Sequence, residues 1–95
     1  MEKLSRERVK EELGDLPEWK EKKSVISRVY QFKDFAAAMK FVSAVAKAAE
    51  KANHHPDIDI RWNKVTLALT THDAGGLTEN DFKGAHQYDK LAKLR

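Results

Sequence analysis

Residues 57–70, Asp-Ile-Asp-Ile-Arg-Trp-Asn-Lys-Val-Thr-Leu-Ala-Leu-Thr, alternate apolar and polar side chains over most of their length. A period of two is typical of β-strands with one buried face and one face in water. The pair Asn63-Lys64 interrupts the alternation and predicts a two-residue hairpin turn. In this register the opposed apolar pairs are Trp62–Val65, Ile60–Leu67 and Ile58–Leu69. All of these pairs share one face, so the register places Trp62 in the core.

Two segments earlier in the chain predict further strands. Residues 24–32 are rich in β-branched and aromatic side chains, and residues 19–22 form a shorter candidate. Together with the hairpin they supply four strands.

Helix-capping residues mark three helices. Ser5 can cap a first helix, and Asp34 can cap a long helix over residues 35–52. The last helix starts at Thr78, where Asp81 three residues later completes a capping-box-like pattern. The element order α-β-β-α-β-β-α favours an α+β fold, in which three helices pack on one face of a four-stranded antiparallel sheet. A chain of 95 residues has room for one core, so we expect a single domain over residues 1–95.

Composition excludes several classes of protein. Apolar residues at 41% and charged residues at 35% are typical of a globular chain, and no apolar run approaches the roughly 18 residues of a membrane span. The formal charge is only +3 and the basic residues are interleaved with acidic ones, which disfavours direct binding of nucleic acid. The charged N-terminal segment lacks the apolar core of a secretory signal, and without cysteine there is no disulfide or thiolate metal site. We therefore expect a cytoplasmic protein that binds no membrane.

The predicted helix over residues 35–52 has an apolar face wider than one sheet needs. Its polar residues form one narrow stripe, Lys40, Ser43, Lys47 and Lys51. The surplus apolar surface predicts a second contact, either with another copy of the chain or with the terminal helices. We expect a homodimer or a homotetramer.

Three histidines gather near the predicted hairpin. His54 and His55 follow the long helix, and His72 follows the second strand, where the register places it opposite His55. Imidazole exchanges protons near neutral pH, so the group predicts proton-transfer chemistry or a metal site. Adjacent side chains in an extended chain point to opposite sides, which disfavours a zinc ion shared by His54 and His55 and favours metal-free acid–base catalysis. His86 has no partner in the sequence and is expected on the surface.

Three neighbouring residues are candidates for ligand binding. Glu50 lies about one helical turn before His54, where it could orient an imidazole or hold a polar ligand edge; a solvated helix-end glutamate is the alternative. Trp62 has a flat ring suited to stacking on a heterocycle, although the alternation assigns it to the core. Asp81 is a helix cap first and a ligand-binding residue second.

These residues in order resemble the signature of the pterin-4a-carbinolamine dehydratases. The signature positions are Glu50, His54-His55-Pro56, Trp62, His72 and Asp81. Three flanking segments are also similar to that family: Lys33-Asp34-Phe35, Asn63-Lys64-Val65 and Gly76-Leu77-Thr78-Glu79. The resemblance extends from Leu4 over nearly the whole chain. It departs at Pro17-Glu18-Trp19, where many members have glycine before the tryptophan.

The resemblance implies an enzyme that removes water from 4a-hydroxytetrahydrobiopterin, a pterin-4a-carbinolamine, and gives quinonoid dihydrobiopterin. This reaction recycles the pterin used by aromatic amino acid hydroxylases. The resemblance also implies that the enzyme needs no metal and no cofactor, and that it forms dimers or tetramers. Of the catalytic candidates His54, His55 and His72, the first and last would be the acid–base pair and His55 mainly a substrate-binding group. Glu50 and Trp62 match motif positions, with roles that carry over less securely.

A non-catalytic dimerisation or assembly partner on the same fold is the alternative function. Such a role would depend on the helix face that carries Phe41 and Val45, and not on the histidines.

Overall fold

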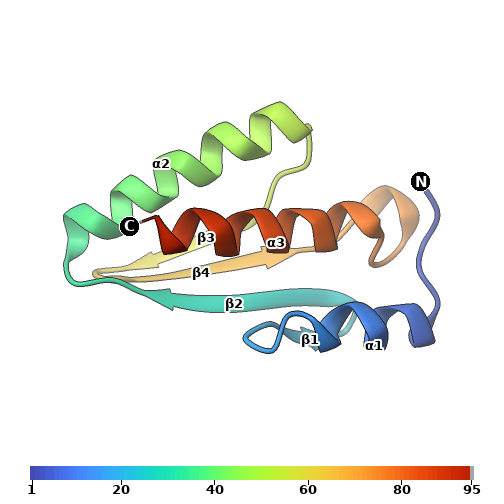
Figure 1. Ribbon diagram of the computed structural model, residues 1–95. Helices are drawn as coiled ribbons and strands as arrows, with labels where there is room; N and C mark the ends of the chain where they lie inside the picture. Colours follow the sequence, from blue (N-terminus) through green and yellow to red (C-terminus); the bar gives the residue numbers. More distant parts are fainter. Residues whose placement is uncertain (95) are drawn as a thin grey trace.

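The structure is a computed structural model and describes residues 1–94 (Figure 1). Its elements in chain order are α1 Arg6–Gly14, β1 Lys20–Lys22, β2 Val25–Gln31, α2 Phe35–Ala52, β3 Asp57–Arg61, β4 Lys64–Leu69, a short 3-10 helix η1 His72–Ala74, and α3 Glu79–Lys93. The predicted α+β class and the order α-β-β-α-β-β-α are confirmed.

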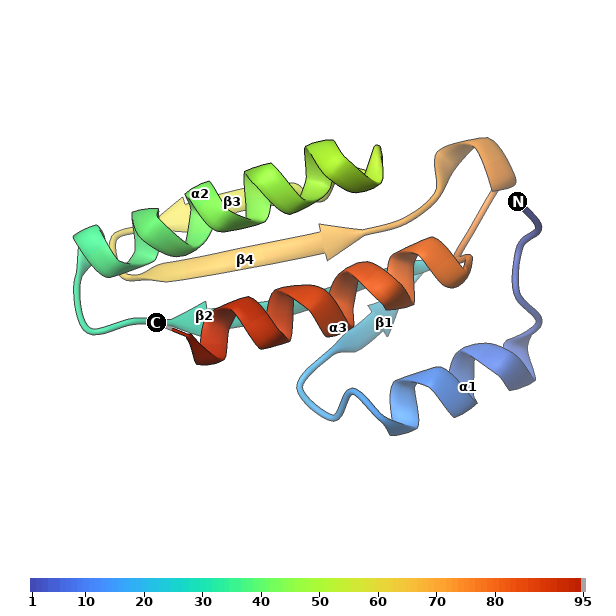
Figure 2. The same ribbon diagram turned by 45° about the horizontal axis from the view of Figure 1, so that its top comes forward.

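The four strands form one antiparallel sheet in the order β1-β2-β4-β3. Helices α2 and α3 lie side by side across one face of this sheet, while α1 lies beside its β1 edge (Figures 1 and 2). Strand β4 is central, and its side chains Val65, Leu67 and Leu69 are buried beneath the helices. The alternation of the sequence thus becomes one covered and one uncovered sheet face.

The predicted helix caps are all present. Ser5 accepts a hydrogen bond from the backbone N–H of Arg8, and Asp34 accepts one from the N–H of Ala37 at 2.8 Å. Thr78 and Asp81 form the capping box of α3. Each cap satisfies backbone N–H groups that have no partner within the helix, which explains why the helices begin at these residues.

The core lies between the sheet and the pair α2 and α3. Phe41 is fully buried at its centre, with its ring centroid 4.7 Å from that of Tyr30 and 5.0 Å from that of Phe32. Val45 follows one turn later and is equally buried. Among the described residues, no helix combines the length and the apolar character that a membrane crossing requires.

Helix α3 is also tied to the strands through Asp89. Its Oδ1 accepts hydrogen bonds from Trp19 Nε1 at 3.0 Å, from Arg28 Nη1 at 2.9 Å and from the Tyr30 hydroxyl at 2.6 Å. Burial, together with this carboxylate, raises the pKa of Tyr30 above its ordinary value. The phenol therefore stays protonated and keeps donating over the physiological pH range.

The predicted register of the hairpin is wrong by two residues. The structure pairs Ile60 with Val65 and Ile58 with Leu67, so the turn is formed by Trp62 and Asn63. Asn63 decides the position of the turn because its side chain is buried, and its Nδ2 donates to the carbonyl of Phe32 at 2.8 Å. The backbone N–H of Phe32 donates in turn to the carbonyl of Asn63 at 2.9 Å.

The assignment of Trp62 to the core is wrong for the same reason. As the first residue of the turn it has a left-handed backbone, with φ of 53°, and 67% of its surface is exposed. A shift of two residues leaves the other apolar side chains on their predicted face, because side chains in a strand alternate with a period of two. Ile58 and Ile60 keep that face, but each is 38% exposed on the edge strand β3, so their predicted burial is also wrong.

Candidate functional site

A buried carboxylate joins three segments that are far apart in the sequence. Asp81, in the first turn of α3, is completely buried. Its Oδ2 accepts hydrogen bonds from the backbone N–H of Thr78 at 2.9 Å and from the hydroxyl of Thr71 at 2.8 Å. Its Oδ1 lies 2.6 Å from Nε2 of His54. The end of α2, the segment after β4 and the start of α3 therefore meet at one side chain.

The two threonines orient this carboxylate. Their hydroxyl oxygens lie 2.9 Å apart, and Thr78 Oγ1 also accepts from the N–H of Asn80 at 3.2 Å. Because Thr71 gives its only hydroxyl hydrogen to Asp81, the hydroxyl of Thr78 donates to Thr71. The chain of donors therefore runs toward Asp81, whose Oδ2 accepts at its end.

This arrangement selects the tautomer of His54. An ionised carboxylate can only accept, so Nε2 of His54 carries the hydrogen in their 2.6 Å contact. Nδ1 is then the ring nitrogen left to exchange a proton with a ligand. The side chain is 16% exposed, which leaves it reachable at the surface. An imidazole held in this way can accept a proton at Nδ1 while Asp81 stabilises the resulting positive charge.

His54 reaches this position because α2 ends abruptly. Asn53 has a left-handed backbone, with φ of 52°, a conformation that asparagine adopts more readily than most residues. The N–H of His54 still donates to the carbonyl of Ala49 at 3.2 Å. The chain therefore turns at Asn53 and delivers His54 to the first turn of α3.

Glu50 and His55 form a second, exposed pair. Oε2 of Glu50 lies 2.6 Å from Nε2 of His55, with 77% and 54% of the respective side chains exposed. The glutamate that the sequence placed one turn before His54 thus contacts the next histidine. Water screens an exposed pair of this kind, so it contributes little to stability and remains available to a polar ligand.

His72 does not lie in the strand ladder, so the predicted opposition to His55 is wrong. Strand β4 ends at Leu69, and Thr71 forms an isolated bridge with Gly76 that closes the loop between them. His72 is therefore the first residue of the 3-10 turn and is exposed. It still follows Thr71 directly, which bonds to the same carboxylate as His54. The structure brings His54, Asp81 and the Thr71–His72 segment together by this route.

Trp62 is not part of this cluster within one chain. It lies beyond the far end of β3, and five extended residues separate it from the histidine end by roughly 16 Å. Residues 1–94 contain no group of three or more His, Cys, Asp or Glu side chains arranged to hold a metal ion. His86 is exposed on α3, as the sequence predicts.

Comparison with protein families identifies the chain. The sequence profile of the family described as pterin 4 alpha carbinolamine dehydratase matches residues 2–91. This chain belongs to the pterin-4a-carbinolamine dehydratase family. The resemblance noted in the sequence is thereby confirmed over nearly the full length.

Relatives and solved structures agree with this membership. A protein of Acidobacterium capsulatum is 55% identical over 91 residues, which are 96% of this chain and 99% of the relative; it is provisionally named a pterin-4-alpha-carbinolamine dehydratase. A Nocardia farcinica protein with the same provisional name is 52% identical over 92 residues, 97% of each chain. The crystal structure of a transcriptional coactivator/pterin dehydratase from Brucella melitensis superposes with a TM-score of 0.91 at 35% identity, covering 95% of this chain and 98% of that one.

A more distant structure shares the fold alone. It is a pterin dehydratase-like protein described as a RuBisCO assembly factor of the alpha-carboxysome, with a TM-score of 0.65 and 24% identity. The superposed part spans 78% of this chain and 86% of the assembly factor's chain.

The sequence analysis did not predict that Thr71 and Thr78 hold Asp81 in place through hydrogen bonds. Thr78 was recognised only as a helix cap. The sequence offered only a threonine soon after a predicted strand and seven residues before the helix cap. The need for additional donors follows from the complete burial of Asp81, which the structure shows.

Proposed function

We propose that the protein removes water from 4a-hydroxytetrahydrobiopterin to give quinonoid dihydrobiopterin. The observation that carries this proposal is the 2.6 Å contact between His54 and the buried Asp81, beside the segment that bears His72. Family membership supplies the substrate class. The pterin enters as a small-molecule partner, and the proposal invokes no metal.

The reaction needs one proton donor and one proton acceptor. The bond from C4a to its hydroxyl oxygen breaks after that oxygen receives a proton and leaves as water. The adjacent ring nitrogen loses its proton, and its electron pair forms the new double bond to C4a. Neutral His54 accepts the ring proton at Nδ1, and protonated His72 gives one to the leaving oxygen. Each such transfer contributes on the order of 10²- to 10⁴-fold in rate.

The exposed pair of Glu50 and His55 would bind the polar edge of the pterin. Both groups lie at the end of α2 that leads into His54: Glu50 is in the last turn of the helix, and His55 directly follows His54. Because both side chains are exposed, they can rearrange around a ligand at little cost. Trp62 has no place at this site within one chain, so a role for it would require a second subunit.

The test is a dehydration assay with a chelator present and a matched set of histidine variants. His54→Ala and His72→Ala are expected to lower kcat/KM by about 10²-fold or more, whereas His86→Ala changes it by less than about twofold. Wild-type protein that does no better than the uncatalysed rate would remove the proposal. Loss of the wild-type rate with chelator would show that the metal-free chemistry is wrong.

We also propose that the protein is a homodimer or homotetramer that associates through α2. The face with Phe41 and Val45, which the sequence suggested for this contact, is fully buried in the protomer and cannot serve. A second apolar stripe with helical spacing remains accessible on α2: Phe35, Met39, Val42 and Ala46. Phe35, the largest side chain of this stripe, is 50% exposed, and a contiguous apolar patch of this kind is typical of an interaction surface.

Light scattering coupled to size-exclusion chromatography tests this association. Ala46→Glu is expected to reduce the mass to that of one 10.9 kDa chain, whereas Ser43→Glu on the polar stripe leaves the oligomer intact. A monomeric wild type would end this part of the proposal. The non-catalytic alternative would be favoured if Ala46→Glu abolished a cellular phenotype that the histidine variants leave unchanged.

A further inference from the structure

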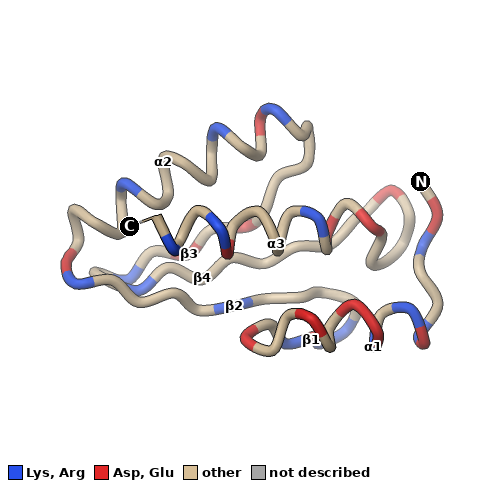
Figure 3. Tube along the Cα trace, viewed as in Figure 1, with Lys and Arg blue, Asp and Glu red and all other residues tan. Residues whose placement is uncertain are grey.

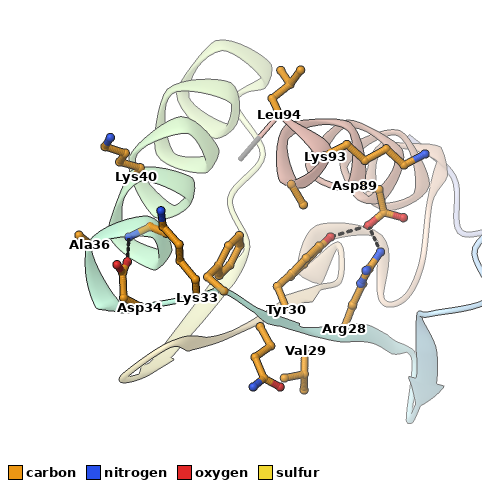
Figure 4. A pocket seen from close by; sticks show the side chains of 14 residues that line it. Arg28, Val29, Tyr30, Lys33, Asp34, Ala36, Lys40, Asp89, Lys93 and Leu94 are labelled. Atoms are coloured by element: carbon orange, nitrogen blue, oxygen red, sulfur yellow. Dashed lines mark hydrogen bonds and ion pairs between the residues drawn. The ribbon is translucent and has the colours of Figure 1, made fainter.

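A cleft of about 820 Å³ lies at the end of the molecule away from the histidines (Figure 4). Its floor is the end of β2, and its walls are the first turns of α2 and the last turns of α3. No residue of the histidine site lines it. Antiparallel pairing explains the separation, because Gln31 at this end of β2 faces the start of β4, while the histidine site lies beyond the end of β4.

The charges that line the cleft favour an anion. Its lining includes four cationic side chains, Arg28, Lys33, Lys40 and Lys93. Between described residues, no ion pair involves any of the three lysines. Figure 3 shows that α2 carries lysines along its length with few acidic residues between them.

Both carboxylates of the lining are already used within the protein. Asp34 caps α2 through its 2.8 Å bond from the N–H of Ala37. Asp89 accepts three hydrogen bonds on a single oxygen, from Trp19, Arg28 and Tyr30. The four cationic and two anionic side chains leave the lining with an excess of two positive charges.

Arg28 is held in a fixed orientation at the floor. Its guanidinium lies 4.3 Å above the Tyr30 ring centroid and pairs with Asp89 at 2.9 Å, as the close view shows (Figure 4). The bond to Asp89 uses Nη1, and Nη2 forms no hydrogen bond with another described residue. A guanidinium fixed in this way, with donor capacity to spare, is suited to anion recognition.

Apart from Gln31, the remaining lining is largely apolar and suits the body of an organic molecule. It comprises Phe32, Ala36, Ala37, Ala92 and Leu94 together with the edge of Tyr30. Leu94 is 73% exposed and lies at the rim. Small-molecule sites typically combine a concave apolar surface of this size with a few convergent polar groups.

We propose that this cleft binds a small organic anion, a phosphate or carboxylate group attached to a flat or apolar body. The charged group lies among Lys33, Lys40, Lys93 and Arg28, and the body rests on Phe32 and the alanines of both helices. This second site is independent of the proposed dehydratase activity.

The test uses phenyl phosphate as the probe and nuclear magnetic resonance of backbone amides as the readout. Saturable shifts are expected at residues 28–40 and 89–94, and not at His54 or His55. Lys40→Glu/Lys93→Glu is expected to weaken binding about tenfold, since each reversal removes an attraction and adds a repulsion. The control Lys47→Glu/Lys83→Glu changes the same charge on the same two helices outside this cleft, and is expected to weaken binding by no more than about twofold.

The outcomes separate the proposal from general charge attraction. Equal weakening by the two double variants would overturn it, as would the absence of saturable shifts. Inorganic phosphate that binds as tightly as phenyl phosphate would contradict the role of the apolar lining, and shifts centred on the histidines would place the anion at the other site. Both double variants are expected to retain dehydratase activity, so failure of either proposal is seen separately.

Discussion

Replacement of Asp81 by asparagine tests the central contact of the histidine site. The carboxylate is completely buried and accepts from three groups: His54, Thr71 and the backbone of Thr78. Asparagine keeps the shape but has only one accepting oxygen. If that oxygen serves Thr71 and Thr78, the amide N–H₂ of Asp81→Asn faces the N–H of His54, and two donors oppose each other.

The expected loss of stability follows from these contacts. Losing one hydrogen bond to a charged group costs about 1.5–3 kcal/mol. Removing a negative charge from the first turn of α3 costs about 0.3–1 kcal/mol more. The sum is about 2–4 kcal/mol, which in a domain of this size lowers Tm by roughly 8–30 °C. A domain with a typical stability of about 5–15 kcal/mol would still fold in most of this range.

Activity should fall through a distinct route. His54 can relieve the opposed donors by moving its hydrogen to Nδ1, which then no longer accepts a proton from the substrate. We expect kcat/KM of folded Asp81→Asn to fall by about 10²-fold.

Urea denaturation and the dehydration assay measure the two effects, with Glu79→Gln as the control. Glu79 is exposed in the same helical turn, so its substitution is expected to cost no more than about 1 kcal/mol and to leave the rate unchanged. An Asp81→Asn protein as stable as this control, or one with a wild-type kcat/KM, would refute the assigned hydrogen bonds.

Three further predictions concern the fold. Phe41→Ala is expected to cost about 3–5 kcal/mol in urea unfolding because the ring is fully buried at the centre of the core; a loss below about 1 kcal/mol would contradict that placement. Asn63→Ala should lower the free energy of unfolding by about 1–3 kcal/mol because it removes a buried hydrogen bond to Phe32. Trp62→Ala at the exposed position beside it should cost less than about 0.5 kcal/mol. The reverse order of the two losses would support the register expected from the sequence. Burial raises the pKa of Tyr30 and of Tyr88 in the folded protein. Above roughly pH 10 these tyrosines therefore lose their protons in the unfolded chain but keep them in the folded protein. The stability that they contribute is full below that pH and falls above it. Tyrosinate absorbance should therefore appear together with the loss of circular dichroism, and phenolate formation in a still-folded protein would be inconsistent with this burial.

The elements of the fold were predictable because their signals are local. Asp34 and Thr78 each cap a helix through residues two or three positions away, and the alternation of β4 lies within six residues. The position of the hairpin turn was not predictable in this way. Asn63 is anchored to Phe32, 31 residues earlier, and no pattern within the hairpin contains that contact.

The histidine site shows the same division. The residue types of His54, His55 and His72 indicate proton chemistry wherever they lie, since that property belongs to imidazole. Their partners depend on how distant segments pack. That Asp81 contacts His54, and that Thr71 holds Asp81, follows from the meeting of α2, α3 and the segment after β4.

Helix α3 is fastened by a carboxylate near each end, Asp81 at its first turn and Asp89 towards its last. A helix normally unravels from its termini, and its amide protons exchange with solvent in order of distance from the ends. Here the N-terminal turn is bound to the segment after β4, and the later turns are bound to β2. The amides of α3 should consequently exchange as one cooperative unit, and the entry of solvent to the buried Asp81 should require the departure of the whole helix.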